Sequence, residues 1–523
     1  MKQALLCTVL LFFLACGSLV AAHEAVSDTD DQVSLIETDH IGDPQAAQQL
    51  RLGVTCTHQN HLRWNFSVIP GQTPETEFQF SSKKFPRPKD DRRFQGLWID
   101  SPFGSGMRSP DGGLDFSHEP LPEFVDILEE VSSRTAPGTT HAESLSVADY
   151  FSAYPLNLSV DREEYLPHDY LRLQLEAYRQ GAEERQYALA HPDEYSASDI
   201  AYYRQMEAEM ADLQQQLQFY EDLQRLFSFP VPENAAVTVT ISKNSSGEVC
   251  EYYSNDGATY SSPVDVPYGS ELPAPTVSDN PMTYLQVPQI QSGDFLYFVP
   301  DFLIGEERMD YSRTPGYGLY RLDLSQEELS IEDLRLVLPL EEAASPSDLI
   351  LDASGTRVLL STVAENQATL YIIDAADSTL VQTISTGTHD LNENHWISCI
   401  TKRDLLLVIQ SWKTFRLFQQ QPDGLYQEQF SGELPDEERF PILLRDLYDM
   451  AYDGKTLAIL SGSSRYSSPG QNPGFNLALW DRSGLVYAGI YNTSLEAGQP
   501  EYYTPGSLVY DALTLDFSAP TKE

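Results

Sequence analysis

The sequence predicts a mainly β protein that is built from repeated sheet units and carries one helical insertion. Short apolar segments recur in pairs along the second half of the chain, with tight turns between them. Residues 160–229, by contrast, place their apolar side chains at the three-and-four spacing of a helix. With 523 residues, of which 41 % are hydrophobic and 11 % aromatic, the chain is long enough to build a large core.

The balance of charge limits the classes of partner. The chain has 78 acidic and 33 basic residues, which gives it a formal charge of −45. Such a surface repels phosphate backbones, so we expect no nucleic-acid partner, while cations, basic peptides and neutral glycans remain open. Because an acidic surface also keeps ordinary soluble proteins apart, the charge alone identifies no function.

The first residues predict export. A basic start, the apolar run Leu5–Leu14 and the small residues that follow are typical of a signal peptide over residues 1–22. The run is too short to span a bilayer permanently. Cleavage there gives a secreted protein that begins at His23. Alternatively, "FLACGS" resembles a bacterial lipobox, which implies a lipidated Cys16 and a protein anchored to the cell membrane.

Residues 23–50 are polar and acidic, which predicts a flexible lead-in to a body that extends over 51–523. The body begins with alternating segments that are typical of strands, among them "LGVTCTHQNHLRWNFSVIPG". Within it, Cys56 and His58 share one face of a strand and His61 points the opposite way, so a metal site needs a turn between them. With Cys56, the body has three cysteines, too few for a disulfide scaffold, so at most one bridge is expected.

Residues 160–229 predict an antiparallel helical hairpin. Pro192 ends the first helix, and Ser198 or Asp199 caps the second. The apolar positions that form the two seams are Leu171, Leu175, Tyr178, Ala182 and Leu189, and Tyr203, Met206, Met210, Leu213, Leu217 and Tyr220. Such a pair is either a strut that covers one face of the sheets or an arm that binds a partner, and we favour the strut.

The paired apolar segments occur four times. In each copy a nearly continuous apolar strand is followed by an alternating one, as expected when the first is buried on both faces and the second on one. Asp323, Asp374 and Asp481 end the second strand in three copies. The copies read "GDFLYFV" with "GLYRLDL", "GTRVLLS" with "TLYIIDA", "RDLLLVI" with "TFRLFQQ", and "GKTLAIL" with "NLALWDR", with anchor residues Leu319, Leu370, Phe415 and Leu477.

Units of this length and pattern resemble the blades of β-propellers of the WD40-like or YVTN-like sort found in exported bacterial proteins. The resemblance covers residues 283–492 and, more weakly, 52–110 and 234–256. It implies about six or seven blades, with Ser507–Phe517 completing a blade that begins near Leu52. No unit carries a GH and WD pair, so the resemblance concerns architecture and names no functional family. The alternative fold is a β-sandwich pair with a helical insert.

The segment "THDLNENHWISC" is the densest run of candidate ligands. Its Asp390, Asn392 and Asn394 match the first half of a calcium loop, but His395 replaces the required glycine and Thr401 the bidentate glutamate. Zinc binding through its histidines and cysteine, and a plain loop with Asx turns, are the alternatives. Calcium at these three residues is therefore a weak candidate, and no other cofactor is expected.

No nucleophile elbow, metalloprotease helix or phosphate-binding loop occurs in the sequence. The sequence therefore favours a non-catalytic, exported, propeller-type binding or scaffold protein at the cell envelope. Its partner is expected to be an envelope protein or a glycan, with membrane contact only through a lipid anchor at Cys16. The alternative is an extracellular hydrolase or lyase with its site in the propeller channel.

Overall fold

The structure of the protein is a computed structural model, and it describes residues 33–58, 61–85, 96–100, 105–108, 114–116, 122–160, 165–166, 168–179, 181–228, 230–255, 259–275, 283–304, 307–309, 311, 314–326, 328–388, 397–410, 414–433, 447–463, 474–494 and 509–518. Within these ranges the protein is mainly β, as predicted, and its sheets contain two to six strands. None of the described helices is both long and apolar enough to cross a membrane.

The chain divides into two compact units. Unit 1 comprises residues 1–93, 352–354 and 385–523, and unit 2 comprises residues 94–351 and 355–384.

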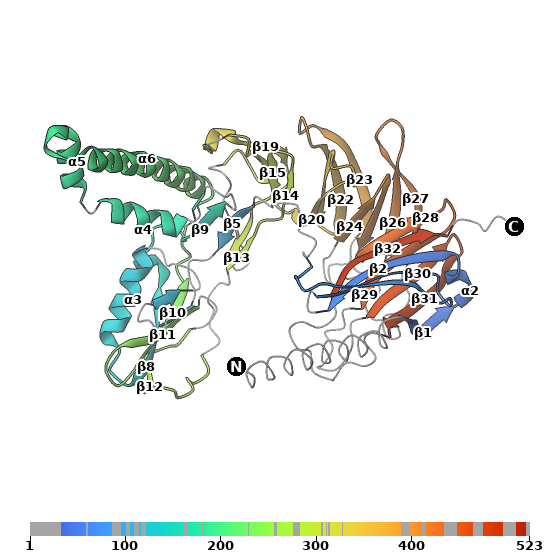
Figure 1. The fold of residues 1–523 in the computed structure, drawn as a ribbon, viewed down its shortest axis with the longest axis horizontal. Coiled ribbons are helices and arrows are strands. Elements are labelled where there is room, and N and C mark those ends of the chain that lie inside the picture. The colour runs from blue at the N-terminus through green and yellow to red at the C-terminus, as the bar shows by residue number, and fades with distance from the viewer. Residues whose placement is uncertain are drawn as a thin grey trace, which may run out of the picture. The chain divides into compact units, whose positions relative to one another are not determined.

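Three four-stranded meanders form most of unit 1 (Figure 1). In the first two meanders, the order of the strands across the sheet follows their order in the sequence. In the third, the last strand of the chain lies at one edge of the sheet, next to three strands from the N-terminal part of the chain. In sheet order they are β24 (Ile397–Lys402), β25 (Leu405–Gln410), β26 (Thr414–Gln420) and β27 (Tyr426–Glu433); β28 (Leu447–Tyr452), β29 (Leu457–Ser463), β30 (Gly474–Asp481) and β31 (Gly484–Thr493); and β32 (Val509–Phe517), β2 (Leu50–His58), β3 (Leu62–Val68) and β4 (Glu75–Phe80). The first strands β24, β28 and β32 lie next to one another in that order.

The C-terminal strand β32 joins a sheet that the N-terminal part of the chain begins. It pairs antiparallel with β2 from Leu50 opposite Phe517 to Thr57 opposite Val509. The predicted pairing of the C-terminal segment with a strand near Leu52 is confirmed. This pairing covers what would be an open edge of β2.

The lead-in prediction is wrong from Leu35 onward. Strand β1 (Leu35–Gly42) adds a fifth strand to the second meander by pairing with β31, and helix α2 (Pro44–Ala47) follows it. Most of the side chains of β1 are exposed. Only Leu35 and Ile41 pack against the cores, and backbone pairing holds the rest, so the polar composition of β1 conceals a strand.

Unit 2 contains two further meanders, except that residues 385–388 of the last strand belong to unit 1. They are β14 (Gln289–Ser292), β15 (Phe295–Phe298), β18 (Gly318–Asp323) and β19 (Leu334–Pro339), and β20 (Ser345–Leu351), β21 (Arg357–Ala364), β22 (Gln367–Asp374) and β23 (Leu380–Thr388). Small sheets join β5 (Leu97–Asp100) to β9 (Asn157–Val160), and β13 (Thr283–Gln286), β16 (Asp301–Ile304) and β17 (Glu307–Arg308).

The four predicted strand pairs are the second and third strands of four of these meanders. The second strands are the most deeply buried, and β25 is buried at all six positions. The third strands alternate, as β26 and β22 do. The anchor residues Leu319, Leu370, Phe415 and Leu477 are each at most 1 % exposed. The repeat therefore reflects one packing pattern that recurs along the chain.

Residues 234–256 do not form the blade that the sequence predicts. The two strands within residues 236–255 lie in a six-stranded sheet, covered by helix α3 (Pro122–Arg134), with its own core of Phe124, Ile127 and Val239. The sheet orders β12 (Val264–Pro267), β8 (Thr139–Ser146), β10 (Ala236–Lys243), β11 (Val249–Asn255), β6 (Ser105–Arg108) and β7 (Leu114–Phe116). Because its strands come from distant parts of the sequence, no local repeat reveals it.

The helical insertion is present, but its first half is broken. Helices α4 (His168–Arg179) and α5 (Ala182–Ala190) both pack on the long α6 (Ala197–Leu226). The break falls at Gly181, whose φ of +84° suits glycine. Ser196, and not Ser198 or Asp199, caps α6 by accepting a hydrogen bond from the Asp199 backbone N–H.

Candidate functional site

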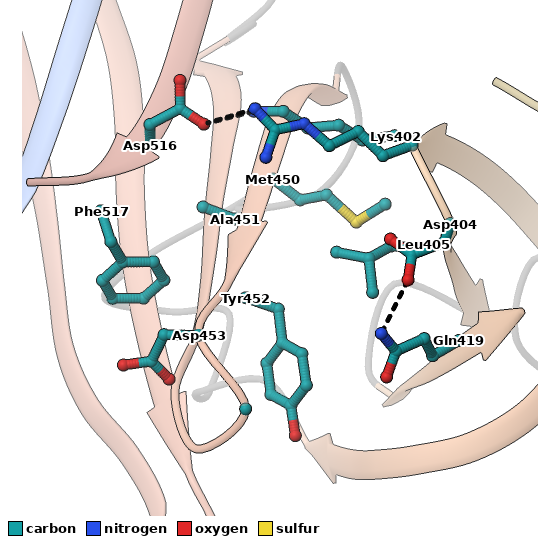
Figure 2. A pocket seen from close by; sticks show the side chains of 12 residues that line it. Lys402, Asp404, Leu405, Gln419, Met450, Ala451, Tyr452, Asp453, Asp516 and Phe517 are labelled. Atoms are coloured by element: carbon teal, nitrogen blue, oxygen red, sulfur yellow. Dashed lines mark hydrogen bonds and ion pairs between the residues drawn. The ribbon is translucent and has the colours of Figure 1, made fainter. Parts of the chain in front are cut away.

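An open pocket of about 630 Å³ lies in unit 1, where the first strands of its three meanders end (Figure 2). Strands β24, β28 and β32 each contribute their last residues, and the turns after β24 and β28 complete the walls. The pocket is lined by Lys402, Arg403, Asp404, Leu405, Gln419, Met450, Ala451, Tyr452, Asp453, Gly454, Asp516 and Phe517.

A lysine and a carboxylate link the three strands at the pocket. The Lys402 ammonium lies 2.8 Å from Asp449 Oδ2 and donates to the Leu515 carbonyl at 2.6 Å. Asp449 Oδ2 also accepts from the Leu515 backbone N–H at 2.7 Å. Both side chains are mostly buried, at 21 % and 12 % exposure. Because its close partners lie within the protein, Lys402 has a structural role in the pocket, and its ammonium group is not available to bind a ligand.

The polar groups at the rim are held by the turns. Asp404 Oδ2 accepts a hydrogen bond from Gln419 at 2.7 Å. Asp453 Oδ1 accepts backbone N–H bonds from the two residues of its own turn, Lys455 and Thr456, at 2.8 and 2.7 Å. These contacts fix each carboxylate in place, while both aspartates remain exposed to solvent. The rim therefore presents oriented hydrogen-bond acceptors.

Arg403 is the most accessible cation of the pocket. It occupies the β24–β25 turn with a φ of +56°, and its side chain is 79 % exposed. Its guanidinium lies 3.8 Å from Asp516 Oδ1, a weak contact that leaves most of its donors facing solvent. A planar group with five donors at this rim suits a ligand rich in oxygen atoms.

Two aromatic side chains complete the pocket. Tyr452 ends β28 and Phe517 ends β32, and both are partly exposed. Figure 2 shows both rings among the lining side chains. The pocket thus combines carboxylates, an amide and a guanidinium with aromatic surface, which is a set of groups for binding.

The predicted calcium residues lie elsewhere in the chain. Asp390, Asn392 and Asn394, together with His395, fall outside the described residues, as does Cys16. Among the described residues, no three His, Cys, Asp or Glu side chains are grouped so that they could hold a metal ion.

The motif "CTHQNH" is largely structural. Cys56 is fully buried in the core beneath β2, and His61 Nδ1 lies 2.9 Å from the Ser81 carbonyl oxygen. None of the three described cysteines, Cys56, Cys250 and Cys399, forms a disulfide. Cys56 and His61 therefore have separate structural surroundings, while the side chain of His58 falls outside what the structure describes.

The pocket residues were missed by sequence reasoning. One signal was available, because Lys402 and Arg403 are adjacent cations in a strongly acidic chain. Their neighbours in the pocket come from segments about 50 and 110 residues further along. Only the adjacent packing of the first strands brings these three segments together.

Comparisons with known proteins identify no family. No family model matches the chain, and no curated protein matches it. Among solved structures it is similar to the β-propeller domain of Cps50 (Swd1) from Myceliophteria thermophila, with 12 % identity, a TM-score of 0.23, and coverage of 51 % of this chain and 70 % of that one.

Two further solved structures are similar at the same level. The β-propeller domain of the trilobed protease from Pyrococcus furiosus is 12 % identical, with a TM-score of 0.23 and coverage of 50 % and 65 % of the two chains. The periplasmic gluconolactonase of Pseudomonas aeruginosa is 13 % identical, with a TM-score of 0.25 and coverage of 54 % and 82 %. The strand pairing of the chain itself defines its fold.

Proposed function

We propose that the chain is an exported β-propeller that binds a glycan at the cell envelope through the pocket of unit 1, without catalysing a reaction on it. The observation that carries the proposal is the pocket at the ends of β24, β28 and β32, where aromatic and hydrogen-bonding side chains meet. Glycans present hydroxyl groups and apolar ring faces together, and such a lining complements both.

The propeller architecture is supported by the sheets. Five meanders of four strands follow one another along the chain, and the last is completed by the chain's two ends. In unit 1 the first strands of consecutive meanders are neighbours, as they are around the axis of a propeller. We propose about six or seven such blades in a closed ring.

Binding is favoured over hydrolysis or elimination by the contacts that the carboxylates make within the protein. Asp404 is bonded to Gln419, Asp453 caps its own turn, and Asp516 lies 3.4 Å from the Lys402 ammonium. Each of these carboxylates is thus held in place by a donor or a cation of the protein and presents its remaining lone pairs as hydrogen-bond acceptors. This arrangement suits acceptors for sugar hydroxyls.

The proposal is tested by affinity electrophoresis of the full chain in gels that contain xylan, glucomannan, mixed-linkage β-glucan or dextran. We expect retardation by at least one of them and a loss of about tenfold or more in affinity for the double variant Tyr452→Ala/Phe517→Ala. Tyr448→Ala is the matched control, because Tyr448 is 44 % exposed on the same strand β28 but does not line the pocket.

Two results would contradict the proposal. Retardation that is equal for the double variant and the control would place binding elsewhere. Release of reducing ends from the retained polysaccharide, lost in Asp453→Asn or Asp516→Asn, would instead support the extracellular hydrolase or lyase.

A further inference from the structure

The helical insertion of unit 2 has a base and a tip with different packing. At the base, the C-terminal half of α6 contributes Leu213, Phe219 and Tyr220 to the large core of the unit. In residues 181–212, here called the arm tip, only Arg185, Ala188 and Ile200 are buried among the described residues. Figure 1 shows α5 and the start of α6 away from the sheets of the same unit. The base therefore packs against the unit as the predicted strut would, while the arm tip remains accessible to solvent.

Aromatic side chains gather on the arm tip. Tyr187 and Tyr202 are 48 % and 59 % exposed. Tyr187 stacks on His191 with 4.3 Å between ring centroids, and Tyr203 lies 5.9 Å from Tyr202 and 6.3 Å from Tyr195. Grouped and exposed tyrosines lose little conformational entropy on binding, and they are enriched at protein interfaces.

The same surface is strongly acidic. Residues 181–212 contain eight acidic and two basic residues, about twice the net negative charge per residue of the whole chain. One of the two cations, Arg185, is buried and paired with Glu207, so it offers nothing to the surface. The Tyr187 hydroxyl donates to Glu194 at 3.2 Å, and the Tyr178 hydroxyl donates to Glu209 at 2.9 Å. Carboxylates thus lie directly beside the phenol rings.

We propose that the arm tip docks an arginine- and lysine-rich segment of a protein partner. A guanidinium or ammonium group placed over a tyrosine face gains a cation–π interaction, and a neighbouring carboxylate completes an ion pair with it. Exposed rings within a negative field complement this chemistry and repel anionic partners. The inference goes beyond the glycan pocket of unit 1 and does not depend on it.

Fluorescence anisotropy with a labelled peptide of six Arg-Ser repeats tests the proposal on the full chain. Because the whole chain carries a charge of −45, it should attract this basic peptide weakly at many places. The comparison of tyrosine variants therefore decides whether the arm tip is the binding site. We expect Tyr187→Ser/Tyr202→Ser to weaken binding about tenfold at 150 mM salt, as loss of two stacking sites implies. A peptide of Glu-Ser repeats should not bind.

The matched control is Tyr253→Ser/Tyr268→Ser, since Tyr253 and Tyr268 are 48 % and 50 % exposed in unit 2 but lie outside the arm tip. It should bind as the unaltered chain does. Hydrogen exchange with and without the peptide gives a second readout, and slower exchange confined to residues 181–212 supports the proposal. Equal affinity of the two double variants, or protection only outside the arm tip, would overturn it.

Discussion

The Lys402–Asp449 pair is the residue-scale feature on which the pocket depends. Asp449 accepts from the Met450 and Leu515 backbone N–H groups as well as from Lys402, so it connects β24, β28 and β32. A carboxylate with three such donors is fully satisfied, and its removal leaves a mostly buried ammonium with fewer partners.

We expect Asp449→Ala to lower the free energy of unfolding by roughly 2–4 kcal/mol, because breaking a buried pair from one side costs more than the pair contributes. Adding Lys402→Met should recover part of that loss. The measurement is the urea midpoint at pH 7, with the exposed Asp404→Ala as control. An unchanged midpoint for Asp449→Ala would show that the pair does not hold the strands together.

Three aspartates at turns, Asp323, Asp374 and Asp481, have pKa values below the usual one for aspartate. The Ser325 hydroxyl, with its backbone N–H, holds the pKa of Asp323 below its usual value, and Ser483 does the same to the pKa of Asp481. Burial opposes the shift at Asp374, but backbone N–H donors still lower its pKa. These are the aspartates that end the third strands of three meanders.

The stabilisation from these carboxylates should be lost in acid. A folded pKa below the unfolded one means that the contribution is complete above the ordinary aspartate pKa and disappears as the pH falls through the lowered value. We expect Asp481→Ala to cost about 0.5–1 kcal/mol at pH 7 and progressively less below about pH 4. Asp481→Asn keeps a hydrogen-bond acceptor but cannot ionise, so the difference in stability between the Asn and Ala variants should not change with pH. A difference that vanished in acid would contradict this account. Thermal melts over pH 3–7 provide the measurement.

At the scale of elements, strand β32 is the critical one. It pairs with β2 along its length and also contacts β28, so its loss uncovers one edge of β2 and the surface of β28 that it covers. A chain that ends at residue 508 should therefore melt less cooperatively and aggregate, because β2 then presents an open edge. A chain that ends at Ser518 keeps every described pairing and should melt like the full chain. Calorimetry and light scattering compare the two, and equal behaviour would be the contrary result.

The elements that sequence reasoning found share one property, which is a local signal. Buried second strands such as β25 are nearly continuously apolar, and α6 carries apolar side chains at helical spacing from Tyr203 to Tyr220. Strand β1 has no such signal because its side chains are exposed, and the six-stranded sheet has none because its strands are scattered along the chain. The pocket escaped detection for the same reason, since its walls meet only through tertiary packing.

Export is the prediction that belongs to the whole molecule. The two predicted cleavage sites give mature proteins with different N-terminal residues. The residue is His23 for a freely secreted protein and a lipid-modified Cys16 for an anchored one. In a bacterial host that expresses the full chain, we expect N-terminal mass spectrometry to find His23 and no labelling by radioactive palmitate. Palmitate labelling that disappears in Cys16→Ser would establish the anchored form instead. An unprocessed N-terminus would contradict both.

The pairing of β2 with β32 also determines when during synthesis the sheet that contains them can be completed. The Ser518 hydroxyl bonds to the carbonyl of Gln49, a partner made 469 residues earlier. Loop closure over such a distance is slow and entropically costly. During synthesis, β2, β3 and β4 can pair with one another, but β2 lacks its other neighbour until residues 509–517 have been made, and only then can this sheet be completed.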